Sequence, residues 1–308
     1  MSQATRVLVT GAAGQVGVDL IDVLTGVTPL GGDATFQPDA RPVNRGEFDP
    51  IGLARRDLDV TDTDSVVATL RDVRPDVVVH LAAYTAVDRA EGDADNCFNV
   101  NEHGVLNMSR GAQDVGAHLI TISTDYVFDG RKGEAYLEHD EPHPLNVYGA
   151  SKREGELRCT DDDTIVRTSW VMGIRGKNVV HTIADRALSG DTVRFVDDQM
   201  GTVTASSDLA RALATLVRER PSGLWHVANV GATTWFSIAA YVGALLHRGE
   251  DFATPISSDE LGTSQVATRP TRSDLNTEKF ASTWSALPPW REGVTRLVVG
   301  RDRLGESA

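Results

Sequence analysis

Short apolar runs alternate with longer amphipathic stretches through the first half of the chain. A near-continuous apolar run is typical of a strand buried on both faces of a parallel sheet, whereas apolar positions three and four residues apart indicate a helix. These patterns predict strands over residues 6–10, 51–54, 76–81, 119–123 and 165–168. They predict helices over residues 16–24, 62–70, 100–115 and 148–157. The alternation indicates an α/β fold with a doubly wound parallel sheet.

The pattern changes after about residue 172, where the segments become more varied and richer in Trp, Pro and Gly. We expect residues 1–172 to form a dinucleotide-binding domain that carries the catalytic residues. We expect residues 173–308 to form a smaller C-terminal substrate-binding region that is interleaved with the sheet. A loop over residues 25–50 is rich in Gly, Pro and Asp and is longer than an α/β connection needs. We interpret this loop as an insertion on the surface.

The first predicted strand leads into a glycine-rich turn that precedes the first helix, Gly11-Ala12-Ala13-Gly14-Gln15-Val16-Gly17. Glycines at positions 11, 14 and 17 allow a tight turn and let the backbone approach a pyrophosphate closely. The helix that follows offers free N–H groups and a partial positive charge at its N-terminus. A glycine motif between a strand and a helix is typical of dinucleotide binding in Rossmann folds. The turn is therefore predicted to hold the pyrophosphate of a nicotinamide cofactor.

The end of the second predicted strand favours one form of that cofactor. An acidic residue is usual there in NAD sites, where it binds the adenosine ribose. This chain instead has Arg55 followed by Arg56, and a guanidinium suits a 2′-phosphate. We predict NADPH as the cofactor, with Arg55 at its 2′-phosphate. A basic pair that only faces solvent explains these residues equally well, so NADH stays an alternative.

Hydroxyl and carboxyl side chains gather at the end of the strand 119–123, in Ser123-Thr124-Asp125, where open α/β sheets place their ligands. Tyr148 and Lys152 lie four residues apart near the start of a helix and so share one face. A free tyrosine has a pKa of about 10, and a neighbouring ammonium lowers it. Lys152 can also bind the nicotinamide ribose. The glycine turn, the Ser-Thr-Asp strand end and the Tyr/Lys pair follow one another in the order of a short-chain dehydrogenase.

The chain is strongly acidic, with a formal net charge of −14 at pH 7. That charge argues against nucleic acid as a partner. Its acidic residues are 30 Asp and 14 Glu, and its basic residues are 26 Arg and 4 Lys. Many aspartates and few lysines resemble proteins that work in molar salt, where the Debye length is about 3 Å and surface charges repel weakly. We predict a halophilic host, with an ordinary acidic protein as the alternative.

Apolar runs stay well short of the roughly 18 residues that suggest a membrane span. The N-terminal residues lack a signal-peptide pattern, so we expect a cytoplasmic protein with no membrane partner. Cys97 and Cys159 lie far apart, with no CxxC spacing and no histidine cluster beside them. We interpret them as reduced thiols and predict no metal site.

Several longer stretches identify a family. The most specific are Ala82-Ala83-Tyr84-Thr85-Ala86-Val87-Asp88 and Ser123-Thr124-Asp125-Tyr126-Val127-Phe128-Asp129-Gly130. Others are Gly14 to Gly17, Arg74-Pro75-Asp76, Pro144 to Lys152, Arg167-Thr168-Ser169-Trp170, Asp198-Gln199-Met200-Gly201 and Arg269-Pro270. On these residues the chain resembles the dTDP-4-dehydrorhamnose reductases, a family of extended short-chain dehydrogenases/reductases, over nearly its whole length. It departs from the family pattern at Met200 and Val203, which leaves fine substrate specificity open.

The resemblance implies a role for each matching residue. In the cofactor site, Gly14, Gln15 and Val16 would hold the pyrophosphate, Asp59 and Val60 would border the adenine, and Ala82, Ala83 and Tyr84 would line the path to the nicotinamide. Thr124, Asp125 and Trp170 would contact the sugar nucleotide, although core packing is an alternative for Trp170. Members of the family sometimes dimerise through a metal held by glutamates. We therefore expect a homodimer as one option, but no such glutamates can be mapped in this chain.

The implied reaction is the NADPH-dependent reduction of the C4 keto group of a dTDP-4-keto-6-deoxy-L-hexose to dTDP-L-rhamnose or its C4 epimer. Thr124, alone or with Ser123, would hydrogen-bond the carbonyl oxygen, and Tyr148 would protonate the developing alkoxide beside Lys152. Two alternatives stay open. A nucleotide-sugar epimerase or dehydratase has the same fold but returns its hydride. A non-catalytic regulatory subunit of the methionine adenosyltransferase type would not need the Tyr/Lys pair, which this chain keeps.

Overall fold

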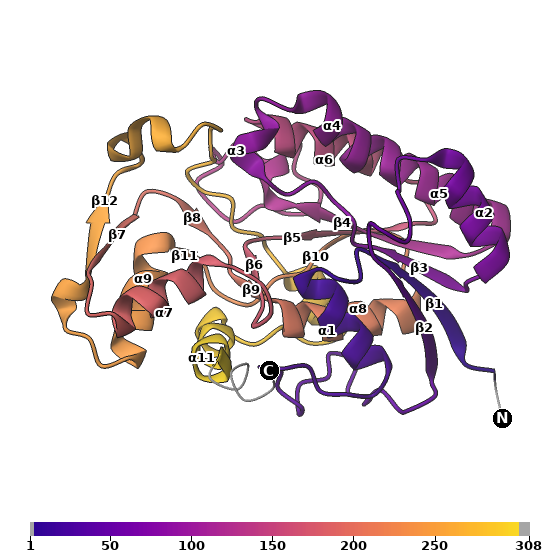
Figure 1. Cartoon of the computed structure of the whole chain (residues 1–308), viewed down its shortest axis with the longest axis horizontal. Coiled ribbons are helices and arrows are strands. Elements are labelled where there is room, and N and C mark those ends of the chain that lie inside the picture. Colours follow the sequence, from indigo (N-terminus) through magenta and orange to yellow (C-terminus); the bar gives the residue numbers. More distant parts are fainter. Residues whose placement is uncertain (1–2, 302–308) are drawn as a thin grey trace.

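A six-stranded parallel sheet forms the centre of the computed structural model, which describes residues 3–301 apart from the side chains of residues 263 and 264 (Figure 1). The strands lie in the order β10-β5-β4-β3-β1-β2. Their bounds are β1 Thr5–Thr10, β2 Phe48–Leu53, β3 Val77–His80, β4 His118–Thr124, β5 Thr164–Thr168 and β10 Gly223–His226. The predicted α/β fold with a parallel sheet is confirmed.

Helices cover both faces of this sheet, and β3 is therefore buried along its whole length. One face carries α2 Thr63–Val73, α4 Ala94–Phe98, α5 Gly104–Val115 and α6 Val147–Leu157, with the short α3 Val87–Ala90 nearby. The other face carries α1 Gln15–Leu24 and α8 Ser206–Glu219, which pack against each other, and α10 Glu278–Thr283 beside β10. Apolar side chains such as Val7, Leu20 and Leu213 fill the core between α1, α8 and the sheet, and each such burial is worth roughly 1.5–3 kcal/mol.

The strand order reverses between β1 and β3, because the chain places β2 on one side of β1 and β3 on the other. Open α/β sheets bind ligands in the crevice that such a reversal creates. The turns that follow β1 and β3 approach each other closely at Gly11, whose φ of +67° favours glycine. A Cβ atom on Gly11 would lie 2.7 Å from the backbone nitrogen of Ala82. Glycine is therefore required where the phosphate turn meets the end of β3.

A smaller lobe lies to the left of the sheet in Figure 1. Its helices α7 Val179–Leu188, α9 Trp235–Leu245 and α11 Trp290–Gly300 share one hydrophobic core. Its paired strands are β7 Val193–Val196 with β12 Ala253–Ile256, β6 Val171–Met172 with β9 Thr204–Ala205, and β8 Met200–Gly201 with β11 Thr233–Thr234. Short 3₁₀ helices lie at Asp125–Val127, Glu250–Phe252 and Ser258–Ser264. In residues 3–301, each helix is too short or too polar to cross a membrane.

The chain crosses between the two parts more than once. Strand β10 and helix α8 come from residues after 172, yet they belong to the sheet and to the layer that covers it. The division of the chain into residues 1–172 and 173–308 stays a prediction, and its outer ends, 1–2 and 302–308, lie outside the described residues.

Residues 25–47, predicted as a surface insertion that ends at residue 50, are packed against the rest of the molecule. Phe36 contacts the main core. Arg218 of α8 forms ion pairs with Asp39 and, at 2.6 Å, with Glu47. Strand β2 then begins at Phe48, earlier than predicted, because the Phe48 side chain is itself part of the core. The segment lies on the surface, as predicted, and it is held against α8 by these ion pairs.

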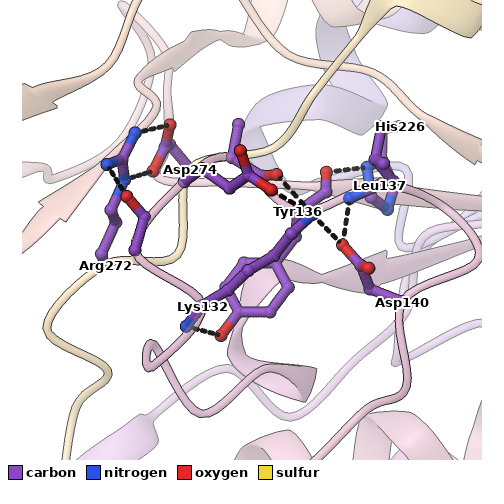
Figure 2. A network of polar contacts seen from close by, with 10 residues as sticks. Lys132, Tyr136, Leu137, Asp140, His226, Arg272 and Asp274 are labelled. Carbon is purple, nitrogen blue, oxygen red and sulfur yellow. Dashed lines mark hydrogen bonds and ion pairs between the residues drawn. The ribbon is translucent and has the colours of Figure 1, made fainter.

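A polar network fastens the segment after β4 to the C-terminal part of the chain (Figure 2). The backbone N–H of Tyr136 donates to the Asp274 carbonyl at 2.9 Å, and the Tyr136 carbonyl lies 3.1 Å from Nδ1 of His226 in β10. Arg272 donates from Nε to the Asp274 carboxylate at 2.7 Å. The network fixes the position of the neighbouring Ser273, which reaches the site described below.

Candidate active site

A pocket of about 890 Å³ opens at the carboxyl ends of the central strands, and every residue assigned to the site from the sequence lines it. These residues are Gly11, Gly14, Gln15, Val16, Gly17, Arg55, Asp59, Val60, Ala82, Ala83, Tyr84, Thr124, Asp125, Tyr148, Lys152 and Trp170. The volume lies near the upper end of the range for ligand sites, which suits two ligands side by side. The fold thus brings the predicted cofactor and substrate residues together, while their individual roles stay predictions.

The N-terminus of α1 is left open toward this pocket. Its N-cap is Gly14, which has no side chain to accept a hydrogen bond, and its first turn contains no acidic residue. By contrast, the side chains of Asp62, Asn146 and Asn178 cap α2, α6 and α7. The free N–H groups and partial positive charge of α1 therefore remain available to an anion. This end of the pocket fits the diphosphate of a dinucleotide.

The residues beyond β2 form another wall of the pocket. Arg55 is exposed to solvent and lines the pocket. The Asp59 carboxylate accepts hydrogen bonds from the backbone N–H and the hydroxyl of Thr61, at 3.0 and 2.7 Å. These bonds hold the pKa of Asp59 below its usual value, and Arg55 adds to the effect. Asp59 thus stabilises its own loop, which contains the buried Val60.

The segment after β3 is held by a residue that the sequence did not single out. Asn101 accepts a hydrogen bond from the Tyr84 N–H at 2.8 Å, and its Nδ2 donates to the Tyr84 carbonyl and to the Ser151 hydroxyl, each at 3.0 Å. Asn101 lies in a π-helical turn over Asn99–His103 that joins α4 to α5. The predicted helix over residues 100–115 is confirmed, but its first turn is π-helical, and this wider turn accommodates the buried Asn101. Turns of this kind are frequent at functional sites.

Tyr148 and Lys152 lie on α6 and face the pocket beside Thr124, the last residue of β4. Burial lowers the pKa of Lys152 to about 8, a fall that the nearby Glu156 opposes. Burial raises the pKa of Tyr148, although its hydrogen bond with Thr124 works in the other direction. The pKa of Tyr148 is thus above its ordinary value, not below it as the spacing to Lys152 suggested, because loss of water disfavours the phenolate. Tyr148 is a neutral phenol that can donate a proton.

The Ser123 hydroxyl contacts a buried ion pair that Glu156 of α6 forms with Arg167 of β5. This hydroxyl donates to Glu156 at 2.5 Å, and Arg167 donates to both carboxylate oxygens of Glu156 at 2.7 Å. Arg167 is only 1% exposed, so the pair is shielded from solvent. Because the Ser123 proton is engaged by Glu156, Ser123 is poorly placed to donate to a substrate carbonyl. Thr124 is the better candidate for that hydrogen bond.

Asp125 connects the end of β4 to the C-terminal part of the chain. Its two carboxylate oxygens accept hydrogen bonds from the hydroxyls of Ser273 at 2.6 Å and Thr124 at 3.1 Å. Burial raises the pKa of Asp125 to about 6, although these hydrogen bonds oppose the rise. Asp125 therefore positions Thr124, while its predicted direct contact with a substrate stays a prediction.

Trp170 packs against the core of the smaller lobe and also lines the pocket. Core packing and the predicted contact with the sugar nucleotide are therefore compatible. The Trp170 indole stacks on Trp235 of α9, with ring centroids 4.0 Å apart and planes 15° from parallel. A Cβ atom on Gly201 would lie 2.6 Å from the Trp170 ring, which explains why this contact needs glycine. Trp170 and Trp235 together form an aromatic wall of the pocket.

Some residues at or behind the pocket were missed from the sequence, namely Asn101, Glu156, Arg175 and Trp235. Glu156 had a usable signal, since it follows Lys152 by four residues and therefore lies on the same helix face. Arg175 and Trp235 follow no motif and reach the pocket only through the packing of the smaller lobe.

Comparisons with known proteins agree on one family. The family model described as RmlD substrate binding domain matches residues 5–301. The chain is 34% identical over 307 residues to the dTDP-4-dehydrorhamnose reductase of Sinorhizobium fredii (strain NBRC 101917 / NGR234), with 95% of this chain and 96% of that protein covered. It is also 34% identical over 308 residues to the Escherichia coli (strain K12) protein of the same name, with 95% and 97% covered.

A solved structure extends the likeness to three dimensions. The crystal structure of a dTDP-4-dehydrorhamnose reductase from Bacillus anthracis str. Ames in complex with NADP superposes with a TM-score of 0.84 at 32% identity, covering 96% of this chain and 99% of that one. Since the family model spans residues 5–301 and the relatives are 34% identical over nearly their whole length, the chain belongs to the RmlD substrate binding domain family.

Proposed function

We propose that this chain uses NADPH to reduce the C4 keto group of a dTDP-4-keto-6-deoxy-L-hexose, giving dTDP-L-rhamnose or its C4 epimer. The observation that carries the proposal is the meeting of the glycine turn, Thr124 and the Tyr148/Lys152 pair in one pocket of about 890 Å³. The names of the relatives from Sinorhizobium fredii and Escherichia coli support the substrate. The NADP in the Bacillus anthracis structure supports the cofactor.

When bound, the reduced nicotinamide supplies a hydride for the C4 carbon. Tyr148 donates its phenolic proton to the carbonyl oxygen, so the ketone gains one hydride and one proton and becomes an alcohol. The raised pKa of Tyr148 keeps the phenol protonated until that oxygen becomes basic. General acid catalysis of this kind is typically worth about 10²–10⁴-fold in rate.

Thr124 and Lys152 assist this transfer. The Thr124 hydroxyl is held by Asp125 at 3.1 Å, which is long for a hydroxyl donor, so it can turn toward the substrate carbonyl. Lys152, with a pKa lowered to about 8, is still largely an ammonium at pH 7. Its charge would bind the nicotinamide ribose and stabilise the tyrosinate that remains after proton transfer.

The cellular setting is part of the proposal. We propose a cytoplasmic homodimer from a halophilic host, without nucleic-acid or membrane partners, in which residues 1–172 form the dinucleotide-binding domain that carries Tyr148 and Lys152, and residues 173–308 form the smaller substrate-binding region. The charge of −14, with 30 Asp and only 4 Lys, supports the salt-rich host. Sedimentation in molar KCl tests the oligomer, and a particle of 33.2 kDa would contradict the dimer.

The decisive experiment mixes the purified protein in molar KCl with NADPH and dTDP-4-keto-L-rhamnose and follows the NADPH absorbance. Oxidation that depends on the sugar, with a reduced sugar nucleotide as product, is the expected result. Conversion of the sugar without net NADPH oxidation would indicate the epimerase or dehydratase alternative. A folded protein that binds NADPH but converts no keto sugar nucleotide would favour the regulatory subunit, and co-purification with methionine adenosyltransferase would then be tested.

A further inference from the structure

The segment that follows β6 lies against the phosphate turn. The backbone N–H of Gly173 donates to the Gln15 side-chain oxygen at 2.7 Å. At Gly176, where φ is +86°, a Cβ atom would lie 3.4 Å from Cγ of Gln15. Asn178 closes the segment by donating to the Gly173 carbonyl at 2.6 Å while it caps α7. Residues 173–178 are thus a strap from the smaller lobe that rests on Gln15.

This strap brings one cation to the pocket. Among the described residues that line the pocket, the Arg and Lys side chains are those of Arg55, Lys152 and Arg175. Arg55 lies beyond β2, and Lys152 belongs to the catalytic pair. Arg175 instead contacts α1, the helix whose uncapped N-terminus points at the pocket, and it shares the pocket wall with Gly14 to Gly17.

Two carboxylates of α1 hold the Arg175 guanidinium by one of its nitrogens. Nη1 donates to Asp22 at 2.9 Å and lies 3.3 Å from Asp19. Asp19 is itself buried and accepts a hydrogen bond from Ser206, so it cannot move far. The Arg175 side chain remains 34% exposed. Within residues 3–301, only Nη1 of Arg175 has a hydrogen-bond partner, so Nε and Nη2 can bind another acceptor. A diphosphate matches the planar guanidinium group.

We propose that Arg175 binds the diphosphate of the nicotinamide cofactor, opposite the backbone N–H groups of the phosphate turn, with Asp19 and Asp22 positioning its guanidinium. The inference rests on the proposed function. A sugar nucleotide also carries a diphosphate, but the hydrogen bond from the strap to Gln15 and the pocket wall that Arg175 shares with the phosphate turn favour the cofactor.

The test is direct binding of NADPH, NADH and dTDP to the full chain without any keto sugar, by nicotinamide fluorescence and by calorimetry. Loss of a charge-assisted hydrogen-bonding group predicts that Arg175→Ala weakens NADPH and NADH equally, by roughly 10- to 100-fold. Arg175→Lys, which keeps the charge without the fork, should weaken both less. Arg55→Ala should change the ratio of NADPH to NADH affinity, because only NADPH carries the 2′-phosphate.

Arg186→Ala is the matched control, because it removes one arginine of α7 whose ion pair with Asp191 lies outside the pocket. It should leave both affinities unchanged. Unchanged NADPH binding by folded Arg175→Ala, or a loss confined to dTDP, would overturn the inference. If Arg175→Ala does not fold, unchanged NADPH and NADH affinity in Arg175→Lys would overturn it instead. Turnover by the wild type reports separately on the proposed function.

Discussion

Burial of ionisable groups governs the site at the scale of single residues. Loss of water raises the pKa of Tyr148 and lowers that of Lys152 to about 8. Burial shifts the two pKa values in opposite directions because tyrosine is charged when it has lost its proton, whereas lysine is charged when it holds its proton. Pairs whose pKa values are pushed apart by their surroundings are typical of acid and base roles. These shifts support the proposed role of Tyr148 as the proton donor of the pair.

Replacing Tyr148 by Phe removes only the phenolic oxygen. We expect kcat of Tyr148→Phe to fall by about 10²–10⁴-fold, because the substrate oxygen loses its general acid, while NADPH binding and the unfolding temperature change little. Steady-state kinetics and a thermal melt measure these effects. Tyr241→Phe is the control, since that hydroxyl bonds to Thr295 away from the pocket. Turnover of Tyr148→Phe close to that of the wild type would remove Tyr148 from the mechanism.

Asp125 predicts a pH effect on stability. Its pKa is about 6 in the folded protein and near 3.8 when unfolded, so the folded state binds the proton more tightly. The buried carboxylate therefore lowers the free energy of unfolding by its full amount above pH 6. This destabilisation disappears as the pH falls through 6 toward 3.8. Asp125→Asn resembles the protonated acid, so its free energy of unfolding should exceed that of the wild type by about 1–3 kcal/mol at pH 7.5. Urea unfolding at pH 7.5 and 4.5 measures this, and a pH-independent difference would contradict it.

At the scale of elements, the packing of α6 against the π-helical turn positions the predicted catalytic pair, Tyr148 and Lys152. α6 carries Tyr148, Lys152 and Glu156 on one face, and the turn over Asn99–His103 presents Asn101 to the end of β3 and to Ser151. The two elements meet at Gly155. A Cβ atom there would clash with the Asn101 carbonyl oxygen.

Gly155→Ala should push α6 away from this turn. The overpacking should cost about 1–3 kcal/mol of stability, and the displaced Tyr148 should lower kcat more than it changes the affinity for NADPH. Gly92→Ala is the control, because the nearest atom to its added Cβ would be 3.9 Å away. Denaturant unfolding and kinetics distinguish the two variants. Equal behaviour of Gly155→Ala and Gly92→Ala would show that the close approach does not matter.

At the scale of the whole molecule, arginines join parts that are distant in sequence. Arg218 connects α8 to residues 39 and 47, Arg296 connects α11 to the buried Asp208, and Arg269 connects the C-terminal segment to Asp88. The chain has 44 acidic and 30 basic residues, so ion pairing leaves an excess of acidic residues and a net charge of −14. Repulsion within that excess disfavours the compact state at low ionic strength, and salt screens it.

Salt should therefore stabilise this protein strongly. We expect the unfolding temperature in 0.1 M KCl to lie roughly 10 °C or more below that in 2 M KCl, equivalent to several kcal/mol for a chain of this size. Calorimetric melts across a KCl series measure the effect, and sucrose of matched water activity is the control for solvent exclusion. Full activity and an unchanged melt in 0.1 M KCl would point to an ordinary acidic protein.

The sequence by itself determined the alternating strands and helices, the glycine turn, the strand end at Thr124 and the Tyr148/Lys152 pair. These features depend on local periodicity or on spacing within one element, which a sequence displays directly. Only the tertiary structure decided that Ser123 serves Glu156, that Asn101 holds Tyr84, and that Arg175 and Trp235 reach the pocket. It also decided the direction of the Tyr148 pKa shift. These outcomes depend on burial and on contacts between distant segments, and neither is set until the whole chain has packed.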